Sequence, residues 1–262
     1  MIKVNDDAHL YLLAEKQLSS DGKVLTSATS DTWSKGSVTV TGGEITVAEK
    51  GTLSVAHNDL VLKGGTISNA GTLQVNKLTI QGGKVANAGT LKADVLNVNS
   101  QIDSTAKGIE STIGTINLNK GGTLNLTSLN GNFAKGLGDK APSDSDTTTI
   151  DNFVFVGGTM NIKGGAITVN GTTLKNMKVG TESSTAKVVV NSDFALDKIV
   201  LGAKGEVEVS DKFTVGNLYI FNGNSKITNN GTVVIGEVTL TDGDLGTSVF
   251  DNTNGTIYTK AV

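Results

Sequence analysis

Apolar and polar residues alternate along most of this chain in short segments that end in glycine or asparagine. The clearest segments start with Gly-Thr-Leu at Gly51, Gly71 and Gly89, which are 20 and 18 residues apart. An alternation with a period of two predicts β-strands that are buried on one face. The first unit predicts strands over Leu53–Val55, Leu60–Leu62 and Thr66–Ile67, and the same apolar positions recur in the next two units.

A unit of this size cannot enclose a core alone, but stacked copies bury their inward side chains against one another, as in a solenoid. An antiparallel meander would also alternate. The repeated tripeptide favours in-register parallel stacking, because a coil of constant length returns equivalent residues to the same wall. At about 20–25 residues per turn and a strand spacing of about 4.8 Å, we expect about 9–11 turns and a rod about 45–55 Å long.

The chain divides into an N-terminal cap or assembly segment over 1–35 and a β-helix over 36–262. Within the first segment, His9–Leu18 predicts a helix, with a short strand as the alternative. Residues 130–149 interrupt the repeat and are expected to form an extruded loop. After Val188 the glycines at 205, 231 and 255 are 26 and 24 residues apart, which predicts longer turns. Aromatic residues concentrate there and are expected to fill a wider coil.

Composition narrows the function classes. The net charge is −3 and no arginine is present, so binding of nucleic acid, phosphate or an anionic membrane is not expected. The absence of cysteine excludes disulfides and thiolate metal sites. No apolar segment is long enough for a transmembrane helix, so we expect no membrane insertion.

Asparagine-rich phrases ending in Gly-Thr-Leu, Gly-Thr-Val or Gly-Thr-Ile recur from Asn69 to Ile257. In this respect residues 36–262 resemble the passenger domains of type V secretion, which include autotransporter adhesins and filamentous-haemagglutinin-like proteins. The resemblance implies a right-handed, three-faced parallel β-helix on the outer surface of a Gram-negative bacterium. It also implies adhesion, self-association or surface display. A signal peptide and a C-terminal membrane barrel, which a whole autotransporter has, are not found in the sequence.

Candidate chemistry is sparse, and we assign no catalytic or cofactor-binding residue. Asp242 and Asp244 have the spacing of a calcium-loop fragment, but a plain Asp-Gly turn explains them more simply. The aspartates at 144, 146 and 151 are read as loop charges. His57 lies at a corner without partner residues that would make it catalytic. A polysaccharide-cleaving β-helix would need clustered carboxylates, whereas these carboxylates are scattered.

Two stacking predictions concern polar residues. Thr52, Thr72 and Thr90 should form one column along the stack. Asn69 and Asn87 should lie at corners, where their amides can hydrogen-bond from turn to turn.

The sequence therefore favours a non-enzymatic, extracellular structural or adhesive protein that acts through the polar faces of a rigid rod. Its partner would be a second copy or a glycan or protein of a host or cell surface, and many weak contacts would add up by multivalency. The alternatives are an assembling S-layer or fibre subunit, and a polysaccharide-binding or polysaccharide-cleaving β-helix.

Overall fold

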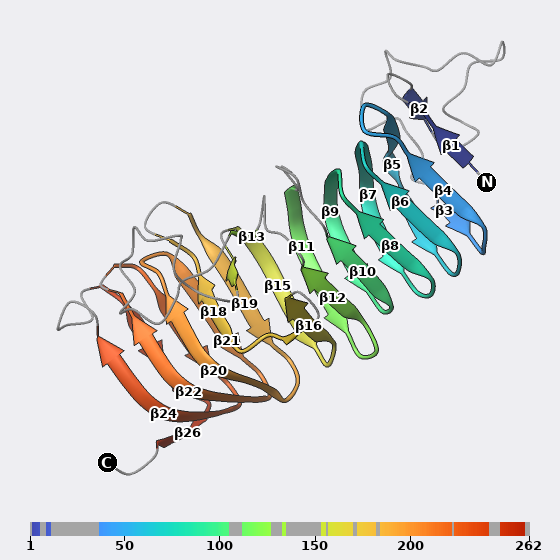
Figure 1. Cartoon of the computed structure of the whole chain (residues 1–262). Helices are drawn as coiled ribbons and strands as arrows, with labels where there is room; N and C mark the ends of the chain where they lie inside the picture. Colours follow the sequence, from blue (N-terminus) through green and yellow to red (C-terminus); the bar gives the residue numbers. More distant parts are fainter. Residues whose placement is uncertain are drawn as a thin grey trace.

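The chain forms an elongated β-solenoid of about eight turns in the computed structural model (Figure 1). Successive turns pair in parallel, and no helix occurs among the residues that the structure describes. The described residues are 2–5, 9–11, 37–104, 112–126, 133–134, 153–155, 157–169, 172–181, 184–221, 223–240 and 247–259. The predicted all-β class, parallel stacking and three faces are thus confirmed.

Three sheets form the walls of the rod. Sheet A contains β1 (Ile2–Val4), β4 (Glu44–Val47), β6 (Thr66–Asn69), β8 (Lys84–Asn87), β10 (Gln101–Ser104), β12 (Thr123–Leu126), β16 (Ala166–Val169) and β17 (Thr172–Thr173). Sheet B contains β2 (His9–Tyr11), β3 (Ser37–Val40), β5 (Thr52–Leu62), β7 (Thr72–Ile80), β9 (Thr90–Val98), β11 (Thr112–Asn119), β15 (Gly158–Lys163), β19 (Ala186–Val190), β21 (Gly205–Val209), β23 (Lys226–Asn229) and β25 (Val249–Asp251). Sheet C contains β13 (Phe133–Ala134), β14 (Phe153–Phe155), β18 (Asn176–Val179), β20 (Phe194–Leu201), β22 (Lys212–Ile220), β24 (Thr232–Leu240) and β26 (Thr256–Thr259).

The longest strands turn a corner and supply two walls each. In β7 the buried residues are Leu73, Val75, Leu78 and Ile80, so the spacing of two becomes three at the corner. The extra residue lets both arms of the strand point their apolar side chains into the rod, since adjacent side chains alternate between faces. Two of the predicted short strands are therefore the two arms of one bent strand.

The registers of paired strands confirm the repeat in the first units. Leu53 pairs with Leu73 and Leu73 with Leu91, so the turns have the same lengths as the Gly-Thr-Leu repeat in the sequence. The aliphatic side chains inside the coil form one continuous core, in which Leu53, Leu73 and Leu91 are each no more than 2% exposed.

Glycine at the start of each unit is required by close packing between turns. A Cβ atom on Gly89 would overlap the backbone carbonyl oxygen of Gly71, and one on Gly71 would overlap that of Gly51. The corners of successive turns thus touch through their backbones, which only glycine permits.

The repeat changes walls in the middle of the rod. Sheet B runs from one end to the other. From β5 to β11 it is built from bent strands, of which only the second arm continues into β15, and from β19 onward it is built from short strands. Sheet A ends at β17, which pairs antiparallel with β16, and sheet C begins with β13 and β14. The short strand of each unit therefore lies in sheet A in the N-terminal stack (β3 to β12) and in sheet B in the C-terminal stack (β18 to β26).

The prediction of longer turns after Val188 holds only for the last turn, in which Thr232 pairs with Thr256. Val188 pairs with Val207 and Val207 with Ile227, so these turns are as long as those of the first units. In sheet B only the last step, from Ile227 to Phe250, is longer. The glycine spacing was misleading because consecutive turns do not all begin with Gly-Thr.

Long steps of sheet B lie instead at the N-terminal end, where Leu10 pairs with Leu53, and in the middle of the chain. Ile116 pairs with Met160, and Met160 pairs with Val188. These two steps use residues that the sequence-based estimate assigned to regular turns, and the rod has about eight turns where about 9–11 were expected.

The N-terminal segment adds strands to the stack. His9–Tyr11 is strand β2, the alternative to the predicted helix, and pairs in parallel with β5, while β1 pairs with β4. Its role as a cap or assembly segment stays a prediction. Apart from Phe133–Ala134, the predicted loop over 130–149 lies outside the described residues.

Candidate functional site

The outward side chains of sheet B form a face that continues along the whole described rod, whereas sheets A and C each cover one part of it. We call this surface the long polar face. One of its columns contains Thr79, Asn97, Asn117, Asn161, Val189, Glu208, Thr228 and Asp251. The neighbouring column contains Asp59, Lys77, Val95, Thr115, Thr159, Lys187, Glu206, Lys226 and Val249.

The first half of the long polar face carries a ladder of amide hydrogen bonds. The Asn97 side chain donates to the Thr79 hydroxyl at 3.0 Å, Asn117 donates to Asn97 at 2.8 Å, and Asn161 donates to Asn117 at 2.9 Å. Each turn thus fixes the side chain of the next, as stacked asparagines do in other parallel stacks. This column is neutral, half-buried and held in one conformation.

The second half of the face is charged. Lys187 and Glu208 form an ion pair at 2.8 Å, and both side chains are about one-third exposed, at 36% and 33%. Lysine and glutamate alternate in the column of Lys187, Glu206 and Lys226. These residues border a shallow hollow of about 170 Å³. Because the pairs are solvated, they contribute little to the stability of the fold.

Asp251 ends the column of the amide ladder in the last turn. The Thr253 side-chain hydroxyl donates to the Asp251 carboxylate at 2.7 Å, and the Thr253 backbone N–H donates to it at 3.0 Å. These two hydrogen bonds, with a smaller contribution from the charge of Lys226, hold the pKa of Asp251 below its usual value. The carboxylate is therefore ionised at neutral pH.

The predicted corner ladder of asparagines is confirmed. The Asn69 amide donates to the Asn87 side chain at 2.7 Å and to the Thr90 carbonyl at 3.0 Å. The equivalent Asn229 donates to Asn252 at 2.6 Å and to the Thr256 carbonyl at 3.0 Å. Asn69, Asn87 and Asn229 are buried, so this ladder stabilises the corners and is not available to a partner.

The predicted threonine column is also present, since Thr52, Thr72 and Thr90 pair in register. The adjacent outward column consists of Ser54, Gln74 and Lys92, whose side chains differ from turn to turn. The wall formed by the first arms of the bent strands in sheet B therefore has one regular outward column. This wall ends at β11.

The structure does not describe most of the predicted site residues. Asp242 and Asp244, and the aspartates at 144, 146 and 151, lie outside the described residues. His57 lies within β5, where the pairing with β7 shifts register. In the part of the chain that the structure describes, no three His, Cys, Asp or Glu side chains are grouped so that they could hold a metal ion.

The outer amide ladder was not predicted from the sequence, although a signal was present. Asn97, Asn117 and Asn161 each stand between two apolar residues, as in Leu96-Asn97-Val98. An asparagine that recurs at the outward position of successive strands indicates a ladder. Asn161 could not be recognised as the third asparagine of the ladder, because it lies much further along the chain from Asn117 than one regular turn.

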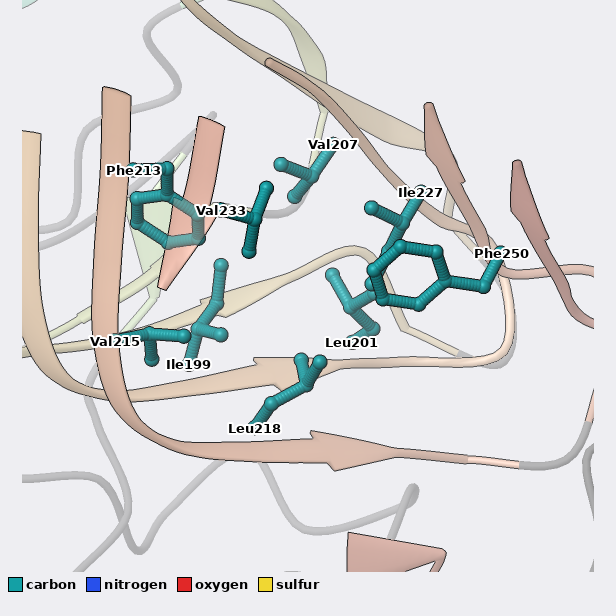
Figure 2. Close-up of a pocket in the computed structure, with 9 residues that line it drawn as sticks. All are labelled: Ile199, Leu201, Val207, Phe213, Val215, Leu218, Ile227, Val233 and Phe250. Atoms are coloured by element: carbon teal, nitrogen blue, oxygen red, sulfur yellow. The ribbon is translucent and has the colours of Figure 1, made fainter. Parts of the chain in front are cut away.

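The cavity inside the C-terminal stack is a packing gap. Figure 2 shows apolar side chains from β20 to β25 that converge on it, among them Phe213, Leu218 and Phe250. Its volume is about 10 Å³, which is at the lower limit for a single water molecule, and its lining is entirely apolar. The chemistry available to a partner therefore lies on the outer walls of the rod.

Comparison with protein-family models, with curated proteins and with solved structures gave no match. Among the described residues there is also no helix of the length and apolar character needed to cross a membrane.

Proposed function

We propose that this chain is an extracellular structural or adhesive β-solenoid of a bacterial surface, which associates with a second copy or with a cell surface through the long polar face. The observation that carries the proposal is the continuity of this face along the rod. The type V passenger resemblance of residues 36–262 supports the same class of function and the same location.

The two halves of the face suit such a role in different ways. The amide ladder offers fixed donors and acceptors at the repeat of the stacked strands, about 4.8 Å. An extended polar partner, whether another strand stack or a surface polymer, can meet it with many equivalent hydrogen bonds. The alternating charges around Lys187 and Glu208 would set the register of the partner.

The proposal is tested with beads or cells that display the chain. The double variant Thr79→Lys/Asn97→Lys places two charges in the neutral ladder, on neighbouring turns of sheet B. The matched control Ser68→Lys/Ala86→Lys places the same charges on neighbouring turns of sheet A, and all four positions are half-buried.

We expect the native chain to cluster beads or to retain them on cells in a concentration-dependent way. The sheet B variant should reduce this about tenfold or more, while the sheet A control should change it little, because multivalent contacts weaken together. Absence of clustering and adhesion by the native chain, or equal loss in both variants, would contradict the proposal. Circular dichroism of both variants checks that the fold is retained.

A further inference from the structure

Two opposite charges of the long polar face lie side by side without forming an ion pair. Glu206 of β21 and Lys226 of β23 occupy the same outward column on adjacent turns, about 4.8 Å apart along the rod. Neither side chain forms an ion pair with another residue that the structure describes, whereas Lys187 of the preceding turn pairs with Glu208. Lys226 is exposed and Glu206 is half-buried, so a partner can reach both groups.

This pair of charges is complementary to its own image. A two-fold axis that is perpendicular to the rod and passes between β21 and β23 brings Glu206 opposite Lys226 of a second copy, and Lys226 opposite its Glu206. The same axis reverses the direction of the second rod. Such an interface is isologous, because the same patch is used by both molecules.

From this symmetry we infer that two copies of the chain pair side by side, in opposite directions, through the charged part of the long polar face. The inference rests on the proposed function, since it uses the same face, and it names the partner as a second copy.

The neighbouring column fits the same arrangement. Glu208 lies one turn before Thr228 in this column, so the axis brings the Glu208 carboxylate opposite the Thr228 hydroxyl of the second copy, which can donate to it. One turn further out, Lys187 lies opposite Val249 and Val189 opposite Asp251. No two like charges therefore meet across the four paired turns, from β19 to β25.

Other two-fold arrangements are less complementary. An axis along the rod keeps each turn opposite its own copy, so Glu206 and Glu208, which share the turn of β21, would face carboxylates. A perpendicular axis at the level of β21 or β23 places Glu206 or Lys226 against itself. An axis between β19 and β21 pairs Glu206 with Lys187, which already pairs with Glu208 at 2.8 Å.

The surface is shaped for long side chains. A hollow of about 170 Å³ is bordered by both lysines and both glutamates, and it gives room to the opposing side chains of the second copy. Each solvated ion pair contributes little, so single molecules should pair weakly. Many copies displayed on one surface would pair strongly with those on another, because the contacts add up by multivalency.

Sedimentation velocity at increasing concentration tests the pairing in solution. At about 10 mM salt, where charges act over about 30 Å, the native chain should form dimers, and added salt should dissociate them. Glu206→Lys and Lys226→Glu each turn both attractive pairs into like-charge pairs, and each should weaken dimerisation about tenfold or more. The controls Glu237→Lys and Lys212→Glu make the same charge changes at exposed positions of sheet C and should have little effect.

The decisive result is mutual rescue. An equimolar mixture of Glu206→Lys and Lys226→Glu chains should dimerise again, because each introduced charge then meets its opposite in the other molecule. The double variant Glu206→Lys/Lys226→Glu should pair with itself for the same reason. Circular dichroism checks that all variants keep the fold.

Three results would overturn the inference: native chains that stay monomeric at all concentrations, single reversals that pair as well as the native chain, and a loss that neither the mixture nor the double variant repairs. The positions changed in Thr79→Lys/Asn97→Lys lie outside the paired turns, so this variant should still dimerise in solution while its adhesion on beads or cells is reduced. Failure of the proposed function and failure of the pairing are thus seen in different measurements.

Discussion

The N-terminal and C-terminal stacks use the same unit but place it on different walls. In both stacks a short strand leads through a corner into a bent strand, with glycine at corners such as Gly71 and Gly231, and buried asparagines link some successive corners. In the N-terminal stack the short strands form sheet A, and in the C-terminal stack they continue sheet B. The sequence of one unit therefore specifies how a single turn is built. Which sheet the short strand of that turn extends depends on where the chain re-enters the stack after the long steps in the middle of the rod.

The outer surface differs accordingly. Where bent strands build sheet B, the outward column contains Val61, Thr79, Asn97 and Asn117. Where short strands build it, the column contains Val189, Glu208, Thr228 and Asp251 and thus gains two carboxylates. The wall change thus joins a neutral ladder to a charged segment on one continuous face. This comparison leads to three experiments on the stability of the two stacks.

The largest effects are expected from cavities in the shared core. Leu78→Ala and Leu218→Ala remove buried side chains at equivalent positions of the two stacks, and each should lower the free energy of unfolding by about 2–5 kcal/mol. Val238→Ala, one turn after Leu218, should cost less than about 1 kcal/mol because Val238 is half exposed.

Chemical denaturation followed by circular dichroism measures these costs, and hydrogen exchange shows which stack loses protection. Unequal costs for Leu78→Ala and Leu218→Ala would show that the two stacks pack differently. A Val238→Ala cost as large as that of Leu218→Ala would show that Val238 is buried in the native chain, which contradicts its exposure here.

A somewhat smaller effect is expected from the corners. Gly89→Ala and Gly231→Ala each place a Cβ atom against a backbone carbonyl oxygen of the preceding turn, of Gly71 and Asp211 respectively. The backbone must shift, at a cost of about 1–3 kcal/mol. Gly42→Ala is the matched control, since its Cβ would meet no heavy atom within 4 Å. Thermal or denaturant unfolding of the three variants should rank Gly42→Ala clearly as the mildest.

The smallest effect is a pH dependence confined to the C-terminal stack. The folded-state pKa of Asp251 is lowered, so its carboxylate stabilises the last turn above the usual aspartate pKa, about 3.9, and this contribution is lost as the pH falls through the lowered value. Amide exchange near β25 should accelerate in that acidic range. Thr253→Ala removes the main hydrogen bond to the carboxylate and should reduce this response, whereas the amide ladder of Asn97 and Asn117 does not titrate. A response that is unchanged in Thr253→Ala would assign it to another group.

Local pattern explains why part of the structure could be predicted. Strand positions, inward residues such as Leu53 and Leu73, the threonine column and the asparagine corners all follow from a period of two and from the Gly-Thr-Leu repeat. The turn length after Val188 could not be read in the same way. Gly205 opens a short strand of sheet B, whereas Gly231 and Gly255 precede strands of sheet C. The spacing from Gly205 to Gly231 therefore compared unlike positions, whereas Gly231 and Gly255 precede paired strands and mark one true turn.

By itself the sequence determined that this protein is a parallel β-solenoid, because alternating side chains and recurring corners depend on residues close together in the chain. Only the tertiary structure decided which walls continue past the middle of the rod, and therefore that Asn161 stacks on Asn117 and that sheet B gives the one face that continues along the described rod. These pairings join residues far apart in the chain, and their choice rests on the packing of complete turns, which no local pattern contains.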